Sequence, residues 1–135
     1  MATNAQFAAT PIVEVTQIPA TANTLRDGSG TITQVCAGPT GAVGAGVGKR
    51  VTRTVVHGIS TTTAGMIRFF VNDFPAANKR LYLEKPVTAV TAFRMEIPEL
   101  SGLILQGTSG LTGNNLYAST NAGETFNIFV ESGLL

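Results

Sequence analysis

The sequence predicts an all-β protein: an antiparallel β-sandwich or jelly roll of about eight strands, preceded by an extended N-terminal arm. Short runs rich in β-branched and aromatic residues recur along the chain, and glycine, proline, asparagine and aspartate separate them. No stretch shows a convincing helical period of apolar residues. With 135 residues, the chain has the length of one domain and can bury a core without disulfides or a metal.

The chain divides into an N-terminal arm, residues 1–24, and a sandwich domain, residues 25–135. The arm mixes Pro11 and Pro19 with alanine, threonine and asparagine, a composition that gives little intrinsic reason for order. Residues 11–18, PIVEVTQI, lie between the two prolines and have the composition of a strand. The rest of the arm is expected to be extended.

The strands of the sandwich are expected after the turn residues Asp27 and Gly28. Each is a short apolar or alternating run with a turn signal at its ends. The predicted strands are TITQVCA (31–37), RVTRTVVHGIST (50–61), GMIRFFVND (65–73), KRLYLEKPV (79–87), AVTAFRMEIP (89–98), LILQG (103–107), NNLYAST (114–120) and ETFNIFVESG (124–133). Residues 73–80, DFPAANKR, have room for one helical turn at most.

Alternation along these strands predicts which side chains share a face. It places Ile67 and Phe69 on one face and Arg68 and Asn72 on the other. Pro86 is expected to end its strand or to put it at a sheet edge. The other predicted inward residues are Val71, Phe93, Met95, Ile97, Phe126, Ile128 and Val130, and the other outward residues are Arg94, Glu96, Asn127 and Glu131. Leu81 and Leu83 are predicted to lie opposite Tyr82 and Glu84.

The glycine-rich stretch AGPTGAVGAGVGKRV (37–51) raises the question of a phosphate-binding loop. A P-loop needs glycine where Val43 stands and a hydroxyl where Arg50 stands. The segment that follows is rich in β-branched residues, whereas a phosphate loop opens directly into a helix. We therefore expect a flexible loop between two strands and no cofactor.

Charge is sparse throughout the chain. Charged residues make up 13% of the sequence and the net charge is +1, against about 25% charged residues in a typical domain. Lys49, Arg50 and Arg53 form the densest basic cluster, which is expected to be solvated, and no basic stripe for nucleic acid is present. The 44% hydrophobic fraction with so little charge favours surfaces that contact other protein.

The cysteine content and the chain start bear on compartment. Cys36 is the only cysteine, so no intramolecular disulfide can form, and we expect a small buried hydrophobe in a protein made in the cytoplasm. The first residues lack the pattern of a signal peptide. No run approaches the roughly 20 apolar residues of a membrane helix. No membrane partner is expected.

No catalytic or metal constellation stands out. His57 is the only histidine, and a triad with Ser60 and Asp73 would lack the nucleophile elbow. One histidine and one cysteine make a metal site improbable on composition. The carboxylates that might pair for glycoside hydrolysis fit a solvated sheet face equally well: Glu84, Glu96, Glu99, Glu124 and Glu131. The 7% aromatic content without tryptophan weakens carbohydrate binding. We expect neither an enzyme nor a small-molecule substrate.

The polar positions are instead rich in threonine, which suits exposed strands and pairs across interfaces without the desolvation cost of a charge. The blocks GVGKRVTRTVVHGISTTTAGMIRFFVND, KRLYLEKPVTAVTAF and LILQG…NNLYASTNAGETFNIFVESG make residues 31–133 similar to small virion structural proteins of tailed bacteriophages. Within that group the chain most resembles head decoration, or cement, proteins.

The resemblance implies a protein made in the host cytoplasm that joins the virion. There it would bind the outer surface of the major capsid protein lattice, as a homotrimer, and stabilise the head. The arm (1–24) and the loop (37–50) are the expected contacts, each able to add a strand to a neighbour's sheet. The alternative is a tail, fibre or adaptor module for host attachment, which would show an exposed aromatic cluster among Phe70, Tyr82, Tyr117 and Phe129.

Overall fold

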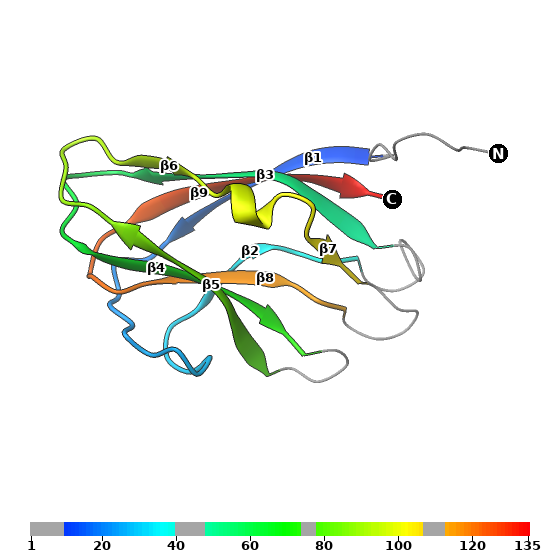
Figure 1. Ribbon diagram of the computed structural model, residues 1–135, viewed down its shortest axis with the longest axis horizontal. Helices are drawn as coiled ribbons and strands as arrows, with labels where there is room; N and C mark the ends of the chain where they lie inside the picture. Colours follow the sequence, from blue (N-terminus) through cyan, green and yellow to red (C-terminus); the bar gives the residue numbers. More distant parts are fainter. Residues whose placement is uncertain (1–9, 40–47, 74–77, 107–112) are drawn as a thin grey trace.

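In the computed structural model, the described residues are 10–39, 48–73, 78–106 and 113–135, and they form two antiparallel sheets packed face to face (Figure 1). Sheet A has the order β1-β9-β3-β6, with the short strand β7 also paired to β3, and sheet B has the order β2-β8-β4-β5. The strands of sheet A are β1 (Thr10–Ile18), β3 (Lys49–Gly58), β6 (Arg94–Glu96), β7 (Ile104–Leu105) and β9 (Phe126–Leu134). Those of sheet B are β2 (Thr33–Cys36), β4 (Gly65–Asn72), β5 (Lys79–Val87) and β8 (Leu116–Thr120). One turn of 3-10 helix, η1 (Pro98–Leu100), lies between β6 and β7.

The connections follow the jelly-roll pattern. The chain passes from one sheet to the other between β1, β2, β3 and β4, and again from β5 to β6 and from β7 through β8 to β9. Consecutive strands therefore lie in opposite layers, with the β4–β5 hairpin in sheet B as the main exception. The predicted all-β sandwich is confirmed.

The first strand lies inside the segment expected to be an arm. Residues 10–18 form β1, which pairs with β9 over nine consecutive positions, from Thr10 opposite Leu134 to Ile18 opposite Phe126. The strand composition noted between the two prolines accounts for this pairing. The structure thus places a strand of the sandwich within residues 1–24, while residues 1–9 lie outside the described part of the chain.

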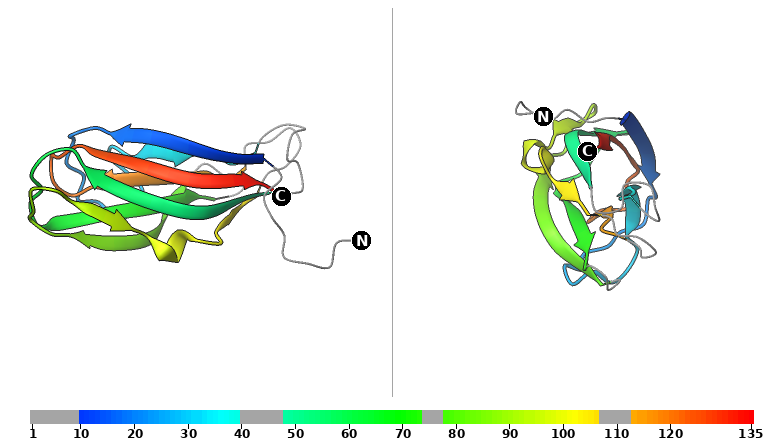
Figure 2. Two further views of the ribbon diagram at one scale, coloured as in Figure 1. Left: turned by 90° about the horizontal axis from the view of Figure 1, so that it is seen from above. Right: turned by 90° about the vertical axis from the view of Figure 1, so that its right-hand side faces the viewer.

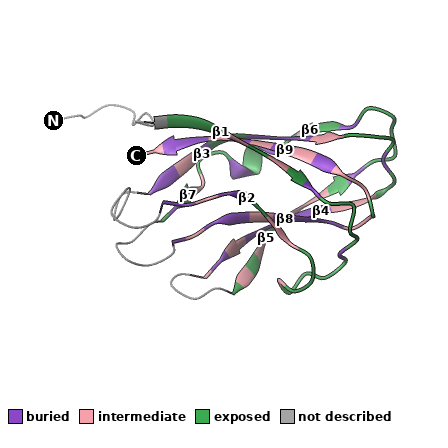
Figure 3. Cartoon of the chain, turned by 180° about the vertical axis from the view of Figure 1, so that it is seen from behind, coloured by how far each residue is buried: buried purple, intermediate pink, exposed green. Residues whose placement is uncertain are grey.

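The core lies between the two sheets, where the alternating residues of both inner faces meet (Figure 3). Phe69, Phe126 and Ile128 have almost no exposed surface, and Leu100 of η1 closes the side of the sandwich. Inward and outward faces are as predicted for β6 and β9, since Glu96 of β6 is exposed and Val130 of β9 is buried, and Ile97, directly after β6, is buried as well. Pro86 lies in β5, an edge strand of sheet B, as expected.

Strand β4 departs from the prediction, because it is buried on both faces. Arg68 and Asn72, predicted to face outward into water, are only 6% and 5% exposed, and Phe70 is fully buried. For Arg68 the reason is the β1–β2 connection, residues 19–32, which crosses the side of sheet B that faces away from sheet A (Figure 1). Asn72 is instead held by residues 113–115, since its amide nitrogen donates to the Gly113 carbonyl oxygen and its amide oxygen accepts from the Asn115 N–H. Local alternation cannot reveal a cover that comes from a distant part of the chain.

Segment 89–98 is shorter as a strand than predicted. Only Arg94–Glu96 pair with β3. The strand cannot continue through Pro98, because Pro98 begins η1 and cannot donate a hydrogen bond to a ladder. The helical turn considered at 73–80 falls largely on residues 74–77, outside the described residues.

Candidate binding surface

The outer face of sheet A carries a row of apolar side chains contributed by three strands. In the register of the sheet, Val15 of β1 lies beside Phe129 of β9, which lies beside Val55 of β3. Directly opposed residues in an antiparallel sheet share a face, so these three side chains form one stripe. Val13, two residues before Val15, extends the stripe, and His57 lies two residues beyond Val55 on β3. We call these five residues the outer-face patch.

The outer-face patch combines a packed centre with an exposed margin. Val13 and Val15 are 58% and 59% exposed, whereas Val55, in the middle of the sheet, is 6% exposed. The His57 ring meets the Phe129 ring edge-on, with 5.7 Å between ring centroids. With Val13 and Val55, these two rings line a shallow depression of about 230 Å³. This volume is below the roughly 300–1,000 Å³ of usual small-molecule pockets. The depression suits one side chain of a partner better than a ligand.

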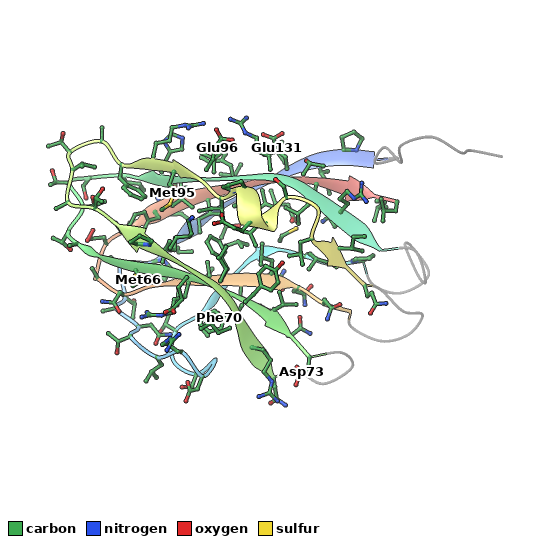
Figure 4. All side chains as sticks on the ribbon, viewed as in Figure 1. Met66, Phe70, Asp73, Met95, Glu96 and Glu131 are labelled. Carbon is green, nitrogen blue, oxygen red and sulfur yellow. The ribbon has the colours of Figure 1, made fainter. Side chains whose placement is uncertain are left out.

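Charged residues surround the patch and pair with one another. Arg53 Nε donates to Glu96 Oε1 at 2.9 Å, and Arg53 Nη1 donates to Glu131 Oε2 at 3.3 Å. Arg94 Nη2 lies 3.7 Å from Glu96 Oε2. Figure 4 shows Glu96 and Glu131 close together and directed away from sheet B. The hydrogen bond from Arg53 holds the pKa of the Glu96 carboxyl group below its usual value. Arg53, Arg94, Glu96 and Glu131 thus form a rim of paired charges around the patch.

The structure does not bring together His57, Ser60 and Asp73, the residues considered as a catalytic triad. His57 lies near the end of β3 and Ser60 in the turn that follows, whereas Asp73 comes after the far end of β4, in the other sheet. The eight residues of β4 separate that turn from Asp73 by about 25 Å. Asp73 Oδ2 instead accepts a hydrogen bond from Arg80 Nε at 3.0 Å, which lowers the pKa of its carboxyl group.

The candidate carboxylates are each engaged by a neighbour. Glu84 accepts from both Arg68 and Arg26, Glu99 binds Lys85, and Glu124 accepts from the backbone N–H and hydroxyl of Thr63. Glu96 and Glu131 belong to the rim described above. Glu131 lines the depression on the outer face of sheet A, whereas Glu96 lines another depression beside it.

Lys49, expected to be solvated, is buried, and this prediction was wrong. Its side chain is 6% exposed, its Nζ donates to the carbonyl oxygen of Ala37 at 2.7 Å, and Glu14 Oε2 of β1 lies 3.5 Å away. Glu14 in turn accepts from the backbone N–H of Ala37 at 3.1 Å. These contacts among Glu14, Lys49 and Ala37 hold the two ends of the glycine-rich segment close to each other. Residues 40–47, the middle of that segment, lie outside the described residues.

Cys36 is fully buried, as predicted. Burial raises the pKa of its thiol to about 12, and the nearby Glu14 carboxylate adds to the shift. The thiol is therefore protonated and unreactive in the folded protein. Within the described ranges, no group of three or more histidine, cysteine, aspartate or glutamate side chains is placed to hold a metal ion. None of the helical segments there has the length and apolar character needed to cross a membrane.

The four aromatic residues named for an attachment role do not form one exposed cluster. Phe70 is fully buried, Tyr117 is half-buried beneath the Lys79 ammonium group, 4.9 Å from the ring centroid, and Tyr82 is exposed on β5. Phe129 belongs to the other sheet. The sequence did not identify the exposed Val13 and Val15 as candidate site residues, because both lie in the segment expected to be an extended arm. The alternation of Val13 and Val15 was the signal that could have revealed them.

Comparisons with known proteins leave the family open. No protein-family model matches the chain, and no curated protein matches it. Among solved structures, it is similar to the CBM22-1–GH10 modules of the N-terminal endo-1,4-β-D-xylanase 10B of Clostridium thermocellum, a structure complexed with xylohexaose. The identity is 13% and the TM-score 0.43, over 93% of this chain and 26% of that chain. The chain thus spans about a quarter of that protein, and a likeness of this degree assigns no ligand to it.

Proposed function

We propose that the chain is a structural protein of a bacteriophage particle, a head decoration protein that binds the outer surface of the capsid through the outer-face patch of sheet A. One observation supports this proposal above the others. The patch has a fully packed apolar centre at Val55, exposed apolar residues beside it, and a rim of four paired charges. An apolar centre inside a polar rim is the usual anatomy of a protein interface.

Two further features agree with a role in assembly. The carboxylates and the histidine considered for catalysis are engaged with neighbours or lie apart, so no described cluster is poised for chemistry. The jelly roll is a fold of viral capsid domains, and lectins and cupins use it as well. The fold therefore supports the proposal by analogy alone. The major capsid protein as partner, the trimer and the location in the virion remain predictions of the sequence resemblance.

The partner surface is defined by the chemistry of the patch. The depression between Val13, Phe129 and His57 accepts one apolar side chain, and the rim offers Arg94 and Glu131 at its opposite ends. Because the rim charges are about half exposed, they contribute little to folding and remain available to steer the partner. The capsid site should therefore present an apolar protrusion flanked by charges of both signs.

The experiment is co-sedimentation of the purified protein with capsid particles of the virus that encodes it. Phe129→Thr removes the aromatic ring between Val15 and Val55, and Val13→Thr exchanges an exposed methyl group for a hydroxyl at nearly constant volume. Tyr82→Thr is the matched control, an exposed aromatic residue on sheet B. We expect both patch variants to bind at least tenfold more weakly and the control to bind normally. Unchanged binding by Phe129→Thr would refute this role for sheet A.

A further inference from the structure

Sheet edges differ sharply in how they are protected against pairing with another chain. An unpaired edge strand is a template for strand addition, and proteins usually blunt it with short length, bulges, lysine or proline. The β2 edge has only four residues with a register shift between Gln34 and Cys36. The β5 edge carries Lys85 and Pro86 and lies beside a register shift. At the remaining edge, β6 and β7 have three and two residues.

Strand β1 is the least protected of the sheet edges. It is nine residues long, about 30 Å, and pairs with β9 without any register shift. Its second edge is paired with no other strand among the described residues (Figure 2, left). Its only proline is Pro11, near the start, and its only charged residue is Glu14, whose charge Lys49 and the Ala37 N–H already engage. The exposed Val13 and Val15 lie on the same strand.

We propose that β1 pairs antiparallel with β1 of a second copy of this chain, about a two-fold axis that passes midway between the two Glu14 residues. A second copy offers one compatible edge, its own β1, because its other edges are blunted. A contact between identical edges closes at two copies and cannot extend into a fibre. The pairing therefore makes a dimer, in place of the trimer that the sequence resemblance implied.

The register follows from which residues can face each other. A two-fold axis normal to the sheet keeps the outer faces of both copies on the same side, so one residue must lie opposite its own equivalent in the partner, with the axis midway between them. Centred on Glu14, all nine residues overlap, and Val13 of each copy lies opposite Val15 of the other. An axis at Val13 would instead set Val15 opposite Pro11, and an axis at Val15 would set Val13 opposite Gln17. The pairing centred on Glu14 is the one that joins valine to valine twice.

The charges permit this register. The two Glu14 residues would face each other on the inner side of the sheet, where like charges are unfavourable. Each carboxylate, however, lies 3.5 Å from the buried ammonium group of Lys49 in its own chain. The centre of the interface thus holds two carboxylates and two ammonium groups, with no net charge. On the outer face, the patches of the two copies become neighbours and form one continuous apolar surface.

The test uses the full chain in solution, without capsid particles, so that it can fail independently of the proposed function. Sedimentation velocity should show a dimer for the wild type and at least a tenfold higher dissociation constant for Val15→Lys. Ile59→Lys is the matched control, because Ile59 is 50% exposed in the turn after β3, away from β1. A wild type that stays monomeric at its highest soluble concentration, forms a trimer, or dimerises equally as Val15→Lys would overturn the proposal.

Cysteine cross-linking tests the register and does not depend on the lysine variant being folded. A mixture of Val13→Cys and Val15→Cys chains should form a disulfide-linked dimer of one chain of each kind. Each variant alone should not cross-link, and Cys36 adds no background because it is fully buried. A cross-link within one variant alone would place the axis elsewhere and contradict the proposed pairing, as would no cross-link in the mixture.

Discussion

Replacement of Arg68 by methionine tests how the β1–β2 connection is held on the outer side of sheet B. The Arg68 side chain is 7% exposed, and its Nε donates to Glu84 Oε1 at 2.7 Å. Its Nη1 donates to the Asn23 carbonyl oxygen at 3.3 Å and to Asn121 Oδ1 at 3.2 Å. Through these bonds, one side chain of β4 fixes a segment of the chain more than forty residues away. Methionine keeps the apolar stem and removes only the charge and the donors.

The expected loss of stability depends on how well the Glu84 carboxylate is still compensated once Arg68 is removed. Removal of one partner of a buried ion pair costs about 3–5 kcal/mol when the other charge is left uncompensated. Glu84 is 21% exposed and keeps Arg26 at 2.8 Å, so the loss should be smaller, about 2–3 kcal/mol. That corresponds to a decrease in Tm of about 10 °C for a domain of this size. Urea unfolding followed by circular dichroism measures the change.

Arg26→Ala is the control for this prediction. It removes the other arginine of Glu84, but its side chain is 64% exposed, and exposed pairs contribute at most about 1 kcal/mol. A free energy of unfolding for Arg68→Met within about 0.5 kcal/mol of the wild type would refute the reasoning. A larger loss in Arg26→Ala than in Arg68→Met would also refute it.

Three further outcomes are expected. Because burial raises the pKa of Cys36 to about 12, Ellman's reagent should label the thiol only when the protein unfolds, and rapid labelling of the folded protein would be inconsistent with its burial. Hydrogen bonds from cationic side chains hold the pKa of Asp73, Glu84, Glu96 and Glu99 below their ordinary values of 3.8 and 4.5. As the pH falls, these carboxyl groups therefore bind protons in the unfolded chain before they do so in the folded protein. The stability that these pairs contribute is complete above about pH 4.5 and is lost as the pH falls through the lowered pKa values. A urea midpoint that rises in acid would contradict this. Gly38→Ala should cost about 1–3 kcal/mol, because its Cβ would overlap the Asn114 carbonyl oxygen, whereas Gly65→Ala has room and should cost less; equal urea midpoints would argue against the close approach.

The alternation of apolar and polar residues correctly predicted the strands that have one buried face and one exposed face. The bounds of β5 agree with the predicted 79–87, and the buried residues of β9 are the predicted Phe126, Ile128 and Val130. In these strands one face meets the core and the other meets water, so the pattern of apolar residues carries the information. The prediction failed at Arg68 because residues 19–32 cover the outer face of sheet B, and a local pattern does not contain that contact.

The candidate site was harder to predict than the fold. The outer-face patch is built from β1, β3 and β9, which come from the start, the middle and the end of the chain. Val13 and Val15 become part of one surface only through the pairing of β1 with β9, and the buried Lys49 is accompanied by Glu14 of β1 and by the Ala37 carbonyl oxygen. Both features depend on long-range pairing that composition does not specify.

A cryo-EM reconstruction of the virus particles tests the central claim most directly, since the claim is that sheet A carries the binding surface. The account predicts density for the jelly roll on the outer capsid surface, with Phe129 and Val13 against the capsid protein and residues 19–32 directed away from it. A jelly roll that contacts the capsid through sheet B, or particles without the protein, would contradict the account.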